Sequence, residues 1–275
     1  MPGADLARRF GGVLRLYGPV GLERLQAAHV LIAGIGGVGS WAAEALARSG
    51  VGKLTLVDLD HIAESNINRQ VHALESSLGA SKIGTMAQRI ADISPACELV
   101  LVDDFLSVQN LDAYVPREAH VVIDAIDQAR VKAALIAHCH GRLQPIVVCS
   151  AAGGRTDPLS LRRDDLALTR GDALLAGVRA RLRRDHGFTR QAGRAFGVSA
   201  IFSSESVTAV ADSADVSVDY DDVAGFKPAD VQAASEVSPR GGAALACSGY
   251  GSIVTVTASM GFAAAQSAIN SVLRR

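Results

Sequence analysis

Residues 29–40 read His-Val-Leu-Ile-Ala-Gly-Ile-Gly-Gly-Val-Gly-Ser, an apolar run that ends in a glycine-rich turn. An amphipathic stretch follows to residue 49, so the pattern predicts a strand, a tight turn and a helix. Such glycines permit the turn, bring the backbone close to a phosphate and let the helix pack on the strand. The helix N-terminus also attracts negative charge. We therefore expect Gly34, Gly36, Gly37 and Gly39 to bind a nucleotide, against the alternative of a packing turn alone.

The rest of the first half alternates short β-branched runs with helical stretches. Apolar runs occur at 53–58, 97–103, 119–126 and 145–150, and amphipathic stretches separate them at 81–93 and 129–141. This alternation predicts an α/β fold, a Rossmann-like doubly wound and mostly parallel sheet. Each predicted strand ends in polar or turn residues, so a ligand site is expected at the carboxyl ends of the strands.

The pattern changes after residue 150, and we interpret 151–250 as a crossover insert on the substrate side. It is expected to contain a helix near 173–184 and a strand near 205–210. Residues 251–275 are predicted to form a C-terminal helix, so the chain reads as one domain, 1–275, with its nucleotide-binding half at 1–150. The apolar stretch 243–265 is rich in Gly, Ser and Thr, which favours a buried helix over a membrane span.

Composition narrows the class of protein. The formal net charge of the 275 residues is -1, which argues against a protein that coats nucleic acid. Residues 155–194 nevertheless carry ten arginines against five aspartates, so any polyanion is expected to bind there. The four cysteines form no Cys-x-x-Cys pair and no zinc is expected. The first residues lack the apolar core of a signal peptide, which predicts a cytoplasmic protein.

Charged residues near the predicted strand ends suggest which nucleotide chemistry the turn serves. Asp58 follows the second strand, where an acidic residue binds ribose hydroxyls. Arg69 and Lys82 follow it in sequence, and nucleotidyl transfer needs such cations because charge builds on the phosphates. Asp127 follows the fourth strand and would hold Mg²⁺ among phosphate oxygens. The last three residues each have an ordinary alternative. Arg69 would form a surface ion pair, Lys82 would be a solvated lysine at a helix start, and Asp127 would be a helix N-cap.

Together these motifs resemble the ubiquitin-activating-enzyme-like superfamily, which includes the sulfur-carrier adenylyltransferases. The resemblance lies in the glycine turn, the acidic 57–60 segment, Asn-x-x-Arg-Gln at 66–70, Lys82 and the 124–127 segment. It implies an ATP-dependent adenylating homodimer with Mg²⁺ near Asp127. The implied nucleotide-binding residues outside the turn are Asp58, Asp60, Asn66, Arg69, Gln70, Lys82 and Asp127. An N-terminal arginine often reaches the neighbouring subunit's ATP in this superfamily, and Arg9, then Arg15, is the candidate here.

Within the superfamily the chain is similar to the tRNA threonylcarbamoyladenosine dehydratases. That similarity lies in Arg-Phe-Gly-Gly at 9–12, the 36–48 and 68–74 runs, Val-Asp-Asp-Phe at 102–105 and Gly-Gly at 153–154. It implies ATP-dependent cyclisation of N6-threonylcarbamoyladenosine at position 37 of tRNA through an acyl-adenylate. The proposed catalytic residues are then Arg9, Arg69, Lys82 and Asp127.

Other readings stay open. The chain could activate the C-terminal glycine of a ubiquitin-like sulfur carrier, although the zinc-binding cysteine pairs common in those enzymes are missing. A nucleotide-sensing protein without turnover and a nicotinamide oxidoreductase are more distant alternatives. Cys247 is interpreted as a buried residue, with a sulfur-relay thiol and a cysteine desulfurase partner as the alternative. A monovalent cation, Na⁺ or K⁺, is left open as a further cofactor.

Overall fold

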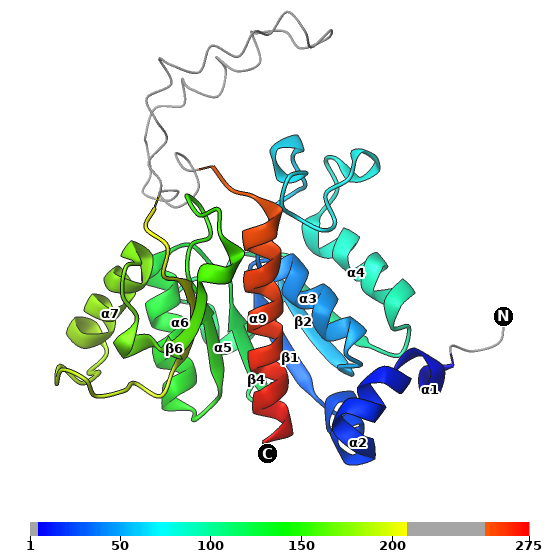
Figure 1. Ribbon diagram of the computed structural model, residues 1–275, viewed down its shortest axis with the longest axis horizontal. Helices are drawn as coiled ribbons and strands as arrows, with labels where there is room; N and C mark the ends of the chain where they lie inside the picture. Colours follow the sequence, from blue (N-terminus) through cyan, green and yellow to red (C-terminus); the bar gives the residue numbers. More distant parts are fainter. Residues whose placement is uncertain (1–4, 208–250, 275) are drawn as a thin grey trace, which may run out of the picture.

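The computed structural model describes residues 5–207 and 251–274. Three expectations fall wholly or partly on the other residues: Cys247, the second half of the predicted strand at 205–210, and the later part of the crossover insert. The described part of the insert and the C-terminal helix are sufficient to place both relative to the sheet (Figure 1).

A seven-stranded sheet forms the centre of the molecule, in the order β3-β2-β1-β4-β5-β7-β6. All neighbouring strands are parallel except β6, which pairs antiparallel with β7 at one edge. The prediction of a Rossmann-like, mostly parallel sheet is confirmed. The strands are β1 (His29–Ala33), β2 (Lys53–Val57), β3 (Glu98–Val102), β4 (Val121–Asp124), β5 (Ile146–Cys149), β6 (Leu161–Asp165) and β7 (Ser199–Ser203).

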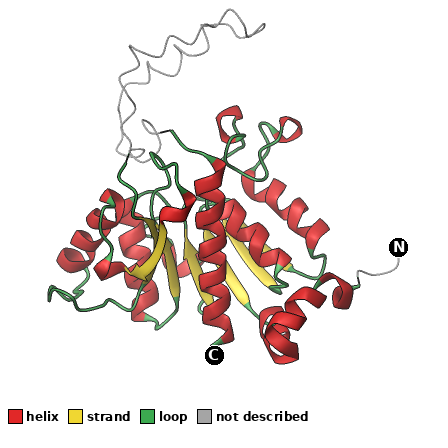
Figure 2. Cartoon of the chain, in the orientation of Figure 1, coloured by secondary structure: helices red, strands yellow, loops and turns green. Residues whose placement is uncertain are grey.

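Helices cover both faces of this sheet (Figures 1 and 2). They are α1 (Leu6–Arg9), α2 (Gly11–Gln26), α3 (Gly39–Arg48), α4 (Lys82–Ile93), α5 (Leu111–Tyr114), α6 (Ala129–Gly141), α7 (Ala173–Asp185) and α9 (Val254–Leu273). Short 3₁₀ turns lie at Glu64–Asn66, Glu75–Ser77, Pro158–Ser160 and Leu166–Leu168. The predicted helices at 173–184 and at the C-terminal end are both present.

Two hydrophobic cores, one on each face, explain why the central strands read as continuous apolar runs. In β1, Val30 and Ile32 pack into the core beneath α3, α4 and α9, whereas Leu31 and Ala33 face the core beneath α5, α6 and α7. Successive side chains of a strand point to opposite faces. Because helices cover both faces, every residue of β1 is buried.

The insert differs from its prediction in its strands. The strand next to β5 is Ser199–Ser203, not 205–210, and residues 204–207 form no strand. The side chains of the apolar run Ala200–Phe202 are buried in this strand. The Glu205 carboxylate instead accepts hydrogen bonds from the backbone N–H groups of Thr156 and Asp157. The edge strand β6 was not predicted, because its sequence Leu-Arg-Arg-Asp-Asp is largely exposed.

The long C-terminal helix α9 lies against the sheet. It contacts α3 and the strands β4, β5 and β7, and Figure 1 shows it in front of the sheet. Val256, Met260 and Ala264 are fully buried on this side. Within the described residues, 5–207 and 251–274, no helix is both long and apolar enough to cross a membrane.

Candidate nucleotide-binding site

A cavity of about 620 Å³ opens at the carboxyl ends of β1, β2, β4 and β5. It lies where the strand order reverses between β1 and β4, which is the usual ligand position in a doubly wound sheet. Its walls come from segments far apart in sequence. They are Gly34–Val38 without Ile35, then Val57, Asp58, Asp60, Ser65, Asn66, Asn68–Gln70, Lys82, Asp104–Leu106, Ala125–Gln128, Ser150–Gly153, Leu174, Gly251, Ser252 and Thr257.

Three glycines of the turn, Gly34, Gly36 and Gly39, have separate physical roles. Gly34 adopts a positive φ of 86° and abuts the Ala125 carbonyl, so a side chain there is strained. A Cβ at Gly36 would meet nothing within 4 Å, which leaves its side of the pocket open to a ligand. A Cβ at Gly39 would lie 1.8 Å from the Gly34 carbonyl oxygen. Gly39 does not line the pocket, and it allows α3 to pack against the turn.

Asp58 connects the end of β2 to this turn. Its carboxylate accepts hydrogen bonds from the Ile35 N–H at 2.6 Å and from the Asp60 N–H at 2.9 Å. The residue is buried, which raises the pKa of the carboxyl group, while the nearby Lys82 charge acts in the opposite direction. Carboxylate oxygens have further lone pairs, so Asp58 can hold the turn and still accept from a ribose hydroxyl.

Two cations lie on the pocket wall, and both have protein partners. The Lys82 ammonium, at the start of α4, pairs with the Asp60 carboxylate at 2.7 Å. The Lys82 side chain is 8% exposed and that of Asp60 is 52% exposed. The Arg69 guanidinium donates to the Ser65 carbonyl and the Asn68 amide oxygen. Both charged residues line the pocket together with the glycine turn, and the Arg69 side chain lies beside Gly37.

The polar residues beside Arg69 differ in what they contact. Asn66 is buried, and its amide oxygen accepts from the Ala63 N–H at 3.1 Å, which shapes the turn before Arg69. Gln70 is also buried, and its Oε1 has no hydrogen-bond partner among the described residues. Gln70 lines the pocket, although this oxygen is itself buried.

Asp127 lies in the loop between β4 and α6, and a buried ion pair supports that loop. Asp124 and Lys132 are both 0% exposed, with Nζ and Oδ1 2.8 Å apart. The same Oδ1 accepts from the Ile126 N–H at 3.1 Å. Burial raises the pKa of Asp124, and Lys132 counteracts that rise. Sequence reasoning marked the 124–127 segment but missed the role of Lys132, because its partner depends on how α6 packs.

Another part of the pocket wall comes from the insert and from the segment that precedes α9. Gly153, Leu174, Gly251 and Ser252 lie there, and the Gly154 N–H donates to the Gly251 carbonyl at 2.8 Å. Behind this wall, Arg155 is 3% exposed and donates to the Gly171 carbonyl. Sequence reasoning missed Leu174 as a lining residue because it belongs to no recognisable motif. The half-exposed Phe105 was noted only as the end of the Val-Asp-Asp-Phe run and not as a lining residue.

Arg9, a proposed catalytic residue, does not line this pocket. Its guanidinium donates to the carbonyl oxygens of Asp92 at 3.1 Å and Ile93 at 2.7 Å, at the C-terminal end of α4. Those carbonyls have no partner within the helix, so Arg9 caps α4 in its own chain. Arg15 is exposed on α2. Action of either arginine on a neighbouring subunit stays a prediction.

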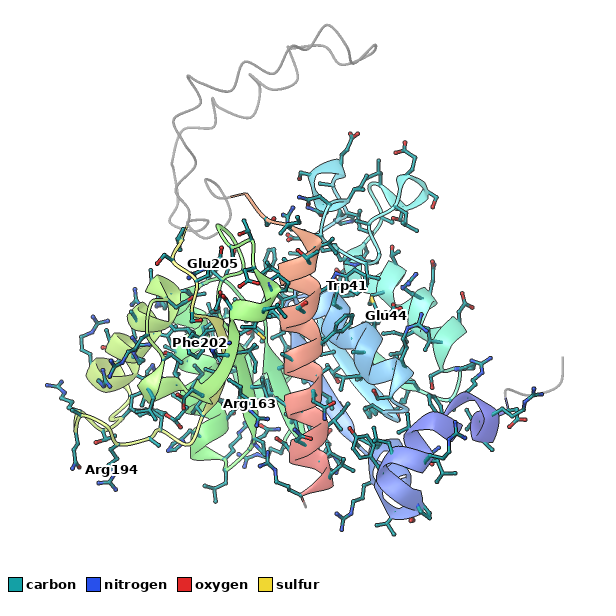
Figure 3. All side chains as sticks on the ribbon, viewed as in Figure 1. Trp41, Glu44, Arg163, Arg194, Phe202 and Glu205 are labelled. Atoms are coloured by element: carbon teal, nitrogen blue, oxygen red, sulfur yellow. The ribbon has the colours of Figure 1, made fainter. Side chains whose placement is uncertain are left out.

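Most arginines of the 155–194 segment are exposed. Among them, Arg163 lies on the edge strand β6 and Arg194 in the loop before β7, both below Glu205 in Figure 3. Other arginines of the segment contact the protein itself. The Arg183 guanidinium lies over the Phe196 ring, 5.2 Å from its centroid. The exposed members are Arg162, Arg163, Arg170, Arg184, Arg190 and Arg194.

The described cysteines and histidines suggest no metal centre. Cys139 and Cys149 are buried in the two cores, where burial raises the pKa of each thiol to about 12. Thiols with such pKa values are poor nucleophiles. Across residues 5–207 and 251–274, no group of three or more His, Cys, Asp or Glu side chains is arranged to hold a metal ion.

Comparison with known proteins agrees with this geometry. The model of the ThiF family matches residues 10–275. The chain is 40% identical over 269 residues to the tRNA threonylcarbamoyladenosine dehydratase of Escherichia coli K12, covering 98% of this chain and 94% of the relative. It is 46% identical over 198 residues to the Haemophilus influenzae protein of the same name, covering 72% and 76%.

Solved structures extend the similarity. The crystal structure of the Escherichia coli dehydratase in complex with ATP superposes with a TM-score of 0.81 at 38% identity, covering 98% of this chain and 96% of that one. A complex of that enzyme with AMP gives the same TM-score. Similarity over nearly the whole of both chains, together with the family match, shows that this chain belongs to the ThiF family.

Proposed function

We propose that this protein is an ATP-dependent tRNA threonylcarbamoyladenosine dehydratase. The observation that carries the proposal is the gathering of Asp58, Arg69, Lys82 and Asp127 around one glycine turn. This pocket occurs in a chain that resembles the Escherichia coli dehydratase over almost its full length. The relative's complexes with ATP and AMP support the same nucleotide here.

In the proposed reaction, an oxygen of the threonine carboxylate attacks the α-phosphorus of ATP and the bond to pyrophosphate breaks. The carbamoyl group then closes onto the activated acyl carbon, the bond to AMP breaks and a proton is lost. The net change is loss of water from the nucleoside. Closure within one modified base benefits from a high effective molarity. Adenylation is needed because a free carboxylate is a poor acyl donor.

The residues of the pocket divide this work. Asp58 would hold the ribose, and the glycine turn would present backbone N–H groups to the phosphates. Arg69 and Lys82 would neutralise the charge that develops on the α-phosphate and the leaving pyrophosphate. Asp127 offers an oxygen ligand of the kind that Mg²⁺ prefers, and Mg²⁺ would supply further charge neutralisation.

We further propose that the substrate tRNA contacts the exposed arginines of residues 155–194. Arginine binds phosphate through paired N–H donors, and each phosphate contact makes the affinity more dependent on salt. A homodimer with Arg9 near the partner's nucleotide, a cytoplasmic location and a sulfur-relay partner are further expectations. The homodimer, the sulfur-relay partner and a monovalent cation rest on the resemblance.

The direct test is release of AMP and pyrophosphate by the purified protein. We expect release with ATP and tRNA that carries threonylcarbamoyladenosine, and loss of 18 Da from that nucleoside by mass spectrometry, the mass of the water removed. Unmodified tRNA is the matched control and should give no release. Release that requires a protein ending in Gly-Gly, and not modified tRNA, would instead support carrier-protein activation.

A further inference from the structure

Trp41 lies in the first turn of α3, directly after the glycine turn. Its indole Nε1 donates to the backbone carbonyl of Arg69 at 3.0 Å. Its ring packs edge to face on Phe262 of α9, with centroids 5.7 Å apart and planes 79° apart. Figure 3 shows Trp41 on the same side of the sheet as α9. The indole therefore connects α3 to the loop that carries a phosphate-binding candidate.

The same carbonyl oxygen has a second donor from α9. The Thr257 hydroxyl lies 3.4 Å from it and 3.3 Å from the Val254 carbonyl, so it is shared between the two. A Cβ added at Gly37 would meet both Thr257 and the Arg69 stem. Nearby, the Asn68 side-chain amide donates to the Ser252 carbonyl at 2.9 Å. The backbone of the 68–69 segment is thus held from two helices, at positions that local sequence does not connect.

The guanidinium of Arg69 is held differently from its backbone. Its Nη1 donates to the Ser65 carbonyl and the Asn68 side chain, both within four residues of it. Local contacts at the end of a long side chain can be exchanged for others without moving the main chain. The hydrogen bond from Trp41 to the Arg69 carbonyl fixes the main chain from which the guanidinium extends.

We infer that Trp41 is a positioning residue for Arg69, fixing its backbone so that the guanidinium reaches the phosphates of ATP. This inference rests on the proposed function, in which Arg69 contacts those phosphates. Trp41 itself does not line the pocket, so it acts through Arg69 and not on the nucleotide.

Trp41→Phe tests the inference, because phenylalanine keeps an aromatic ring for Phe262 and loses only the indole and its N–H donor. A neutral hydrogen bond is worth about 1 kcal/mol, so the dissociation constant for ATP, measured by calorimetry, is expected to rise about 3- to 10-fold. The value of kcat for AMP release should fall as well, since Arg69 acts on the developing charge.

Phe262→Leu is the matched control. It removes the ring contact and leaves the indole hydrogen bond, so it should lower the unfolding midpoint without changing ATP affinity. If Trp41→Phe binds ATP with wild-type affinity, or if both variants weaken ATP binding equally, Trp41 serves packing alone and the inference is wrong.

The wild-type protein supplies an independent readout. Trp41 is the single tryptophan of the chain, so its emission reports on this hydrogen bond, and ATP is expected to change it. No change on saturation with ATP would contradict the inference even if Trp41→Phe failed to fold. ATP binding with an emission change, but no AMP release with modified tRNA, would reject the proposed function and leave the role of Trp41 intact.

Discussion

The buried pair of Asp124 and Lys132 allows a quantitative prediction about folding. Both side chains are 0% exposed and their charges lie 2.8 Å apart. Lys132→Met leaves the Asp124 carboxylate with the Ile126 N–H as its remaining donor, and its Oδ2 has no partner in the described chain. Breaking a buried pair in this way costs about 3–5 kcal/mol of unfolding free energy, against about 5–15 kcal/mol for a whole domain.

Urea unfolding followed by Trp41 emission measures this loss. With a slope of about 3 kcal/mol per molar urea, the midpoint should fall by about 1–2 M. The control is Lys53→Met, which breaks the exposed Lys53–Glu98 pair on the edge of the sheet. That variant should lose no more than about 1 kcal/mol, because solvent screens exposed pairs.

The double variant Lys132→Met with Asp124→Asn separates charge from packing. It removes both charges and keeps an oxygen acceptor for the Ile126 N–H, so most of the stability should return. The single variant should also depend on pH. Its folded state retains the Asp124 proton above the ordinary aspartate pKa, so its stability falls as pH rises and its deficit shrinks towards pH 4. A double variant as unstable as Lys132→Met would refute the reasoning.

The remaining predictions concern the turn, a buried histidine and the proposed catalytic residues. Gly36→Ala should fold normally and lose ATP binding, whereas Gly39→Ala should lose both, since its Cβ would lie 1.8 Å from a carbonyl oxygen; dialysis with ATP and urea titration distinguish them. Burial lowers the pKa of His72 to about 4, so stability should fall by up to ~3 kcal/mol as pH drops from 6.5 to 4; in urea titrations His72→Leu should remove that slope. Arg69→Ala and Asp127→Ala should each slow AMP release at least ~100-fold with an unchanged unfolding midpoint, and near-normal rates would exclude them from the site.

How far the sequence predicts the fold depends on burial. The strands β1, β2, β4 and β5 are buried, so their apolar runs are continuous and were found from sequence. The edge strand β3 is largely exposed, and it was found because its sequence Glu-Leu-Val-Leu-Val is still apolar. The edge strand β6 consists of exposed charges and has no such signal. Its position depends instead on Asp165, whose carboxylate accepts from the N–H groups of Phe196, Gly197 and Val198. Contacts across thirty residues leave no local pattern.

The same distinction holds within the site. Motif spacing predicted which loops supply Asp58, Lys82 and Asp127, because parallel strands bring their carboxyl ends to one edge of the sheet. It could not predict what anchors those loops. The carbonyl of Arg69 meets an indole from α3 and a hydroxyl from α9, and such meetings depend on the packing of complete helices.

The pairing of the pocket cations bears on how a triphosphate would bind. Lys82 is nearly buried, and a buried ammonium without a counter-charge would be costly; Asp60 supplies that charge. ATP that takes Lys82 in the proposed way replaces one anion by another, so no unpaired charge has to form on the protein. Asp60 is the more exposed partner, so water can solvate its carboxylate once it is released. Binding then proceeds as an exchange of partners, and the cost falls on the residue that solvent can reach.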